Sequence, residues 1–82
     1  MDETSLLERI AINPNVMGGK PVIKGTCLTV EYIVGLLAHD ATAEEIHQEY
    51  QGLTRDDIQA CLLFATKSLQ STEFMPLAVE AA

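Results

Sequence analysis

A loop rich in glycine and lysine is the first segment of this chain whose residue types suit chemistry. The run Gly18–Thr26 reads GGKPVIKGT. A phosphate-binding loop of the Walker type needs GxxxxGK followed by Ser or Thr, so that a row of backbone N–H groups cradles the phosphates. Here Lys20 is followed by Pro21, which has no backbone N–H, and Pro14 stands where the first glycine should be. We therefore interpret the loop as a structural turn whose glycines adopt positive φ, and we expect no nucleotide chemistry.

Two cysteines and two histidines are the other side chains that could bind a metal or act as nucleophiles: Cys27, His39, His47 and Cys61. Their separations match no common structural zinc pattern, in which the ligands come in closely spaced pairs. Spacing alone leaves a Cys–His nucleophile pair open, but no carboxylate is well placed to orient the histidine. We expect no catalytic residue, metal or cofactor, and hence no enzyme. Both cysteines are expected to be reduced thiols packed in apolar surroundings.

The charge of the chain is strongly negative and unevenly distributed. The 82 residues carry a formal net charge of −7, to which residues 1–25 contribute nothing and residues 26–82 contribute everything. Phosphate backbones attract Lys and Arg, so an acidic region of this kind argues against autonomous nucleic-acid binding and favours a basic partner protein. No apolar run approaches the roughly 20 residues that a membrane span needs. The N-terminus also lacks the basic region of a secretion signal, so we expect a cytoplasmic protein without membrane contact.

A single small domain is predicted over residues 1–70, followed by a C-terminal tail at 71–82. Within the domain, β and turn structure is expected over about residues 9–30 and three helices over about residues 30–68. The fold class is therefore mainly α, with a short β-hairpin element at the N-terminal side. A core this small supplies only a few kcal/mol of net stability, so a partner or a second copy would add to it.

The β-rich start contains three short strand candidates. Ile10–Ile12 is stopped by the turn-forming residues that follow it. Pro21–Ile23 and Cys27–Val30 flank Lys24–Thr26, which has the composition of a hairpin turn. Strands of this length need other elements to cover them.

Three threonines mark the starts of the predicted helices. These helices run from about Val30 to Ala38, from Ala43 to Tyr50 and from Arg55 to Ser68, with Thr29, Thr42 and Thr54 as their N-caps. Thr42 is followed three residues later by Glu45, which makes a capping box. Gly52 can supply the left-handed residue that ends the second helix. Three helices with a tight glycine turn between the last two make a helix-turn-helix arrangement, which serves any small three-helix core as well as DNA readers.

The last predicted helix is apolar nearly all round. Its expected core stripe consists of Ile58, Cys61, Leu62, Ala65 and Leu69. Leu63 and Phe64 fall well outside this stripe at about 100° per residue. Either the β-rich start or the tail covers them, or they form an interface with a partner or a second copy. Phe74 and Leu77 belong to a tail that is either a frayed end or a segment that orders on a partner's groove.

Three segments carry a family resemblance: Gly18–Thr26, Leu28–Val30 and Gly52–Ile58. With them the chain resembles, from about Arg9 to Ala65, the domain-of-unknown-function family 433. The resemblance implies a homeodomain-like helix-turn-helix fold in a small prokaryotic protein, often one that looks like an antitoxin encoded beside a PIN-like ribonuclease toxin. The chain departs from the family pattern at two positions. Cys27 replaces the usual arginine after Gly-Thr, and Asp40 replaces the glycine that commonly breaks the first helix.

The leading hypothesis is a non-enzymatic, antitoxin-like protein that binds and neutralises a PIN-like ribonuclease toxin. The alternative is a DNA-binding transcriptional regulator that acts on its own operator. The candidate contact residues for a partner or for DNA are Lys20, Lys24, Arg55, Gln59, Leu63, Phe64, Phe74 and Leu77. A homodimer is also expected, joined through the β-rich start, whose edge has unpaired backbone groups, or through the third helix.

Overall fold

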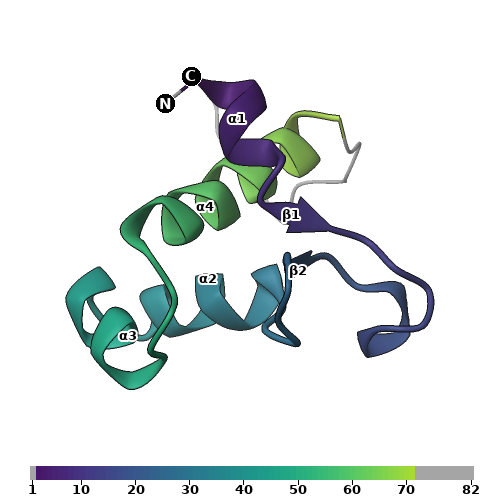
Figure 1. Ribbon diagram of the computed structural model, residues 1–82. Coiled ribbons are helices and arrows are strands. Elements are labelled where there is room, and N and C mark those ends of the chain that lie inside the picture. The colour runs from purple at the N-terminus through teal and green to yellow at the C-terminus, as the bar shows by residue number, and fades with distance from the viewer. Residues whose placement is uncertain (1, 72–82) are drawn as a thin grey trace, which may run out of the picture.

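The structure is a computed structural model that describes residues 2–71 (Figure 1). The elements in chain order are α1 (Glu3–Leu7), β1 (Ile10–Ala11), a 3₁₀ turn (Met17–Gly19), β2 (Val22–Ile23), α2 (Val30–Ala38), α3 (Ala43–Glu49) and α4 (Arg55–Gln70). The fold is mainly α with a short β-hairpin element, as predicted. Among the described residues, no helix has both the length and the apolar character that crossing a membrane requires.

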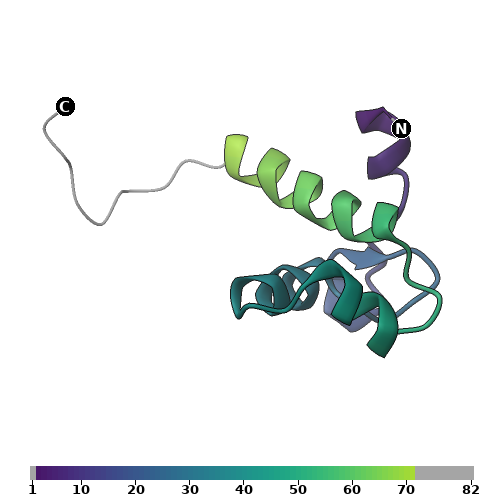
Figure 2. The ribbon, with the colours of Figure 1, turned by 90° about the vertical axis from the view of Figure 1, so that its left-hand side faces the viewer.

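The longest helix, α4, lies in the middle of the molecule. α1 packs on one side of it, and α2 and α3 lie on the other side (Figures 1 and 2). The core between these layers is a cluster of buried apolar side chains contributed by β2, all three longer helices and the α3–α4 turn: Ile23, Val30, Ile33, Ile46, Leu53, Ile58 and Cys61. Ile33 and Cys61 are fully buried. Burial raises the pKa of the Cys61 thiol to about 12, so it packs as a neutral apolar group.

Local capping signals set the helix starts where the sequence predicts them. The Thr29 hydroxyl accepts the Tyr32 N–H at 3.0 Å, and α2 has the predicted bounds. Thr42 and Thr54 each form a complete capping box, with Glu45 and Asp57 as the returning carboxylates. The predicted ends are less accurate, because α3 stops one residue earlier than expected and α4 continues to Gln70.

The glycines that the sequence predicts to adopt positive φ do so in the structure. Gly52 after α3 has a φ of +97°, and Gly18, Gly19 and Gly25 in the glycine–lysine loop have φ angles of +66°, +84° and +82°. Asp40, in the turn after α2, also adopts a positive φ of +73°. Asp tolerates this region better than most side chains, which explains how it can replace a glycine there.

The β element is smaller than expected. β1 pairs antiparallel with β2, with Ile10 opposite Ile23, and in the turn that follows β2 the Thr26 N–H donates to Ile23 O at 3.0 Å. The prediction of a strand at Cys27–Val30 is wrong, because its only ladder contact is a single bridge between Thr29 and β2. Thr29 is already the N-cap of α2, so the chain turns into the helix before a second strand can form.

The N-terminal helix α1 was not predicted. Asp2 caps it, because its side chain accepts the Ser5 N–H at 2.8 Å. Lys67 of α4 forms an ion pair with Glu3 at 3.1 Å, which joins the first turn of α1 to the last turns of α4. Five residues are too few for a stable isolated helix, so α1 depends on its packing against α4.

The buried face of α4 also differs from the predicted stripe. Leu62 and Leu69 are exposed, whereas Phe64 packs against the core and Leu63 is half-buried. Asp57, Ala60 and Cys61 lie on the buried side, which rotates that side by roughly 80° from the predicted stripe at 100° per residue. The expectation of a packed Cys27 is likewise wrong, because Cys27 is exposed in the turn before α2.

Candidate interaction surface

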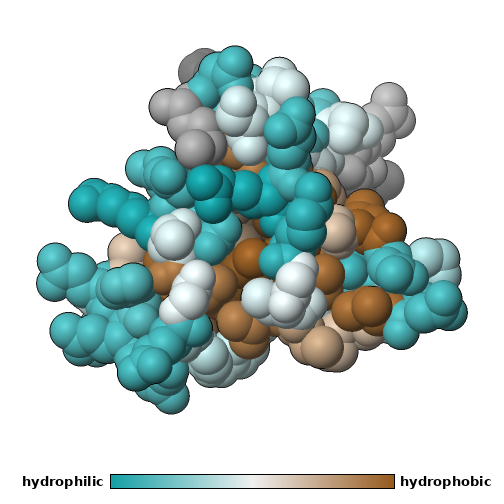
Figure 3. Space-filling view, in the orientation of Figure 1, coloured by the Kyte–Doolittle hydropathy of each residue, from teal (hydrophilic) through white to brown (hydrophobic). Residues whose placement is uncertain are grey.

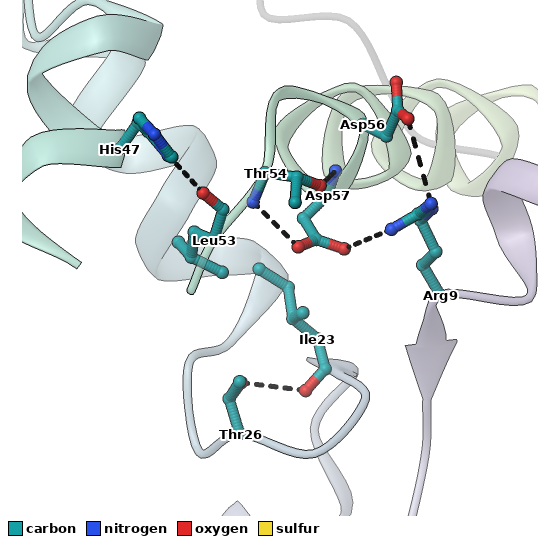
Figure 4. A network of polar contacts seen from close by, with 8 residues as sticks. All are labelled: Arg9, Ile23, Thr26, His47, Leu53, Thr54, Asp56 and Asp57. Carbon is teal, nitrogen blue, oxygen red and sulfur yellow. Dashed lines mark hydrogen bonds and ion pairs between the residues drawn. The ribbon is translucent and has the colours of Figure 1, made fainter. Parts of the chain in front are cut away.

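A buried acidic residue fixes the start of α4 against the N-terminal segment (Figure 4). Asp57 is only 8% exposed. One of its carboxylate oxygens accepts the Thr54 N–H at 3.0 Å, and the other accepts Arg9 Nη1 at 3.0 Å. The Arg9 guanidinium also lies 3.7 Å from the exposed carboxylate of Asp56. In addition, the Arg9 carbonyl accepts the Lys24 N–H at 2.8 Å, so this residue before β1 joins the turn after β2 to α4.

This contact explains why an acid can occupy the buried face of α4. Burial raises the pKa of Asp57, but the hydrogen bonds from Thr54 and Arg9 and the charge of Arg9 together outweigh burial, and the net pKa is lowered. The carboxylate therefore stays charged, and Arg9 neutralises it within the network. With Asp57 on the buried side, the apolar residues that share its face become the core residues of α4.

Three exposed glutamates make α3 the most acidic helix of the described chain. Glu44, Glu45 and Glu49 are all exposed, and Asp40 precedes them in the turn after α2. α3 contains no Lys or Arg, and only Ile46 is buried. We call these four acids the α3 acidic surface. Figure 3 shows hydrophilic side chains gathered over the region of α3, on the opposite side from the hydrophobic patch near β1 and β2.

The basic candidate residues of the glycine–lysine loop lie apart from the α3 acidic surface. Lys20 is exposed and forms an ion pair with Glu31 of α2 at 3.0 Å. Lys24 is exposed in the turn after β2, and within residues 2–71 it has no ion-pair partner. The structure therefore does not gather the two lysines around one anion site.

The candidate residues on α4 divide into two groups. Arg55 and Gln59 are exposed one turn apart near the start of the helix. Leu63 and Phe64 are half-buried, and Phe64 packs against the core. Phe74 and Leu77 lie outside the described residues.

The residues that the sequence offered as ligands or nucleophiles are widely dispersed. His39 Nδ1 donates to Gly35 O of its own helix at 2.8 Å, and His47 Nδ1 is hydrogen bonded to Leu53 O. Cys61 is buried in the core, and Cys27 is exposed in the turn before α2. Among the described residues, no three His, Cys, Asp or Glu side chains converge in a geometry that could hold a metal ion.

With this geometry in place, comparison with known proteins supplies the family. The family model described as "Protein of unknown function (DUF433)" matches residues 10–65. The chain belongs to the DUF433 family. Its fold is similar to the crystal structure of a DUF433 member protein from Anabaena variabilis ATCC 29413, with a TM-score of 0.74 and 28% sequence identity. The match covers 82% of this chain and 66% of the crystallised one, so the chain spans just under two thirds of that protein's length. No curated protein matches the chain.

The matched region of this DUF433 chain begins at β1, directly after Arg9. Sequence reasoning missed Arg9 because it counted this residue only as a charge. The signal that could have found it is the acidic pair Asp56–Asp57 at the start of α4, since an acid on a buried face needs a cation from another segment. The spacing of Glu45 and Glu49 could also have predicted that these two carboxylates lie together, because residues four apart share a helix face.

Proposed function

We propose that this DUF433 protein is a non-enzymatic, antitoxin-like protein that binds and neutralises a PIN-like ribonuclease. The observation that supports the proposal best is the α3 acidic surface, whose exposed carboxylates have no ion-pair partner among residues 2–71. A PIN-type nuclease combines clustered carboxylates and divalent metal with a basic surface for RNA. An uncompensated acidic surface is complementary to such a basic surface and can cover it.

The distribution of basic side chains supports a protein partner rather than nucleic acid. Arg9, Lys20 and Lys67 each form an ion pair with a carboxylate of the same chain. Within the described residues this leaves Lys24 and Arg55 as the cations without such a partner. Two isolated cations release few counterions from a duplex, whereas salt-dependent binding to DNA rests on several phosphate contacts.

Co-expression with a PIN-like protein encoded in the adjacent reading frame tests the proposal. The two chains should co-purify and elute together in size-exclusion chromatography at low salt. Because opposite surface charges drive the encounter, raising the salt concentration should weaken the complex. Separate elution of the two folded chains at low salt would rule out this partner.

DNA binding is the second candidate, and one observation favours it. Arg55 and Gln59 are both exposed on one face of α4, one turn apart, as two base-reading side chains would be. The acidic Asp56 beside them is partly neutralised by Arg9. A regulator of its own operator would shift that DNA in an electrophoretic assay with steep salt dependence. No shift at low salt, with or without the ribonuclease, would remove this candidate.

We further propose that a homodimer forms through α4. Leu62 is 44% exposed and Leu69 is 62% exposed, and their spacing of seven residues places both on one side of the helix. Two such helices can pack these leucines against each other. The Leu62→Glu variant should therefore convert a dimer into a folded monomer, which light scattering at micromolar concentration would measure.

A matched control for the dimer lies on the same helix. Phe64→Glu should unfold the chain rather than dissociate it, because Phe64 packs against the core. Circular dichroism separates the two effects. The α4 dimer would be contradicted if the unmodified protein has the mass of one chain, or if Leu62→Glu leaves a dimer intact.

A further inference from the structure

A cavity of about 140 Å³ lies between α2 and α3, at the edge of the α3 acidic surface. Its apolar lining is formed by Leu36, Ala41 and Ile46. The cavity is large enough to take the head group of one side chain.

Two tyrosines form the aromatic part of this cavity. Tyr32 of α2 and Tyr50 after α3 pack edge to face, with ring centroids 6.1 Å apart and an interplanar angle of 84°. Their hydroxyl groups share a hydrogen bond. That hydrogen bond raises the pKa of Tyr50 to about 12, with smaller contributions from burial and from the charges of Tyr32 and Glu49. The Tyr50 ring is therefore neutral at physiological pH, and an aromatic face attracts a cation.

Two carboxylates complete the lining. Glu45 and Glu49 are four residues apart on α3, so both lie on the side that faces the cavity. One oxygen of Glu45 accepts the Thr42 N–H at 3.0 Å, which leaves its other oxygen available. Neither glutamate has an ion-pair partner among residues 2–71. The cavity thus combines an apolar floor, two aromatic rings and two uncompensated negative charges.

We propose that this cavity binds the guanidinium group of an arginine side chain from the partner protein. The inference rests on the proposed function, because it names the group on a basic partner that this surface would recognise. A guanidinium fits better than an ammonium, since it is planar, can stack on a tyrosine ring and can donate to both carboxylates at once. A bare metal ion fits poorly, because the described residues contribute only two carboxylates to the lining of the cavity.

A small arginine derivative tests whether the cavity binds a guanidinium group in the absence of the partner protein. In a ¹H–¹⁵N NMR titration of the whole chain, N-acetyl-arginine amide should shift the backbone signals of Tyr32, Glu45, Glu49 and Tyr50 in a saturable manner. N-acetyl-citrulline amide has almost the same shape without the charge and should shift none of them. Equal effects of citrulline, or tighter binding of N-acetyl-lysine amide, would overturn the assignment of a guanidinium.

Glutamine variants locate the site. Glu45→Gln together with Glu49→Gln should lower the association constant of N-acetyl-arginine amide by about tenfold or more, which is about 1.4 kcal/mol or more. Gln at position 45 preserves the capping box, so the helix start should remain intact. Glu44→Gln is the matched control, because Glu44 is an exposed acid of the same helix that does not line the cavity. An equal loss for Glu44→Gln would show nonspecific attraction and contradict the proposal.

The arginine titration and the partner-binding assay test the cavity assignment and the proposed function separately. If the arginine derivative binds at the cavity but the ribonuclease does not bind the chain, the proposed function fails while the cavity assignment stands. If the ribonuclease binds equally well to the unmodified chain and to the Glu45→Gln/Glu49→Gln variant, the proposed function stands and the cavity assignment is overturned.

Discussion

Asp57→Asn is expected to lower the free energy of unfolding by about 1.5–3 kcal/mol, because it removes a charged, buried acceptor of two hydrogen bonds. The variant leaves the Arg9 guanidinium without its closest carboxylate and weakens the capping box of α4. For a domain of this size, a loss of 2 kcal/mol corresponds to a decrease in Tm of roughly 8–16 °C. Urea denaturation followed by circular dichroism would measure the change in unfolding free energy.

The neighbouring residue provides the control. Asp56→Asn removes the same charge from the adjacent position, but the Asp56 carboxylate is 45% exposed and lies 3.7 Å from Arg9. An exposed ion pair of this length contributes about 0–1 kcal/mol. We therefore expect Asp56→Asn to have less than half the effect of Asp57→Asn. Equal losses for the two variants would mean that net charge, and not the buried network, determines stability.

The same carboxylate makes stability depend on pH. The folded-state pKa of Asp57 lies below its value in the unfolded chain, so protons bind the unfolded state more readily. The stabilisation is present in full above the unfolded pKa of about 3.9 and is lost as the pH falls through the folded-state pKa. Between pH 6 and pH 3, the unmodified chain should consequently lose more stability than Asp57→Asn does.

Helix starts in this chain could be predicted because the information is local. Each of Thr29, Thr42 and Thr54 accepts a backbone N–H three residues later, and no distant contact is needed for that bond. The positive φ of Gly52 could be predicted for the same reason, because a glycine directly after a helix is a local signal. Helix α1, in contrast, has five residues and forms against α4, so its own sequence carries little signal.

The buried face of α4 could not be predicted because a distant residue determines it. Arg9 lies 48 positions before Asp57 and neutralises it, and this allows an acid to replace an apolar residue on the buried side. Without Arg9, counting apolar residues favours a stripe that contains Leu62 and Leu69, and both are exposed in the structure. The candidate interaction surface could not be fully predicted for the same reason, because it too depends on residues far apart in the sequence. Periodicity places Glu45 and Glu49 on one helix face, but only the folded chain brings Tyr32 of α2 to the same cavity.

Reversing charges on α3 is expected to have the largest effect on function. Glu44→Lys with Glu49→Lys replaces two exposed acids by two bases and should weaken binding to the ribonuclease by about a hundredfold or more, since each close charge pair at an interface can contribute more than 1.4 kcal/mol. Glu45 is left unchanged to preserve the capping box. Folding should suffer little, because the changed side chains are exposed.

A matched reversal on α1 controls for net charge. Glu3→Lys with Glu8→Lys changes the total charge by the same amount, but α1 lies on the opposite side of α4 from α3 (Figures 1 and 2). The exposed pair of Glu3 with Lys67 is lost in this variant, at a cost of about 1 kcal/mol or less. If the α3 acidic surface makes the contact, this control should bind the ribonuclease within about tenfold of the unmodified chain, because only long-range attraction is weakened.

Ribonuclease activity measured during titration with this protein tests the antitoxin proposal most directly. The PIN-like ribonuclease, assayed on a single-stranded RNA with its divalent metal, should lose activity in proportion to added protein until a fixed stoichiometry is reached. The α1 variant should inhibit in the same way, and the α3 variant should fail to inhibit at the same concentrations. Full ribonuclease activity in the presence of excess unmodified protein, or equal inhibition by the α3 variant, would contradict the account.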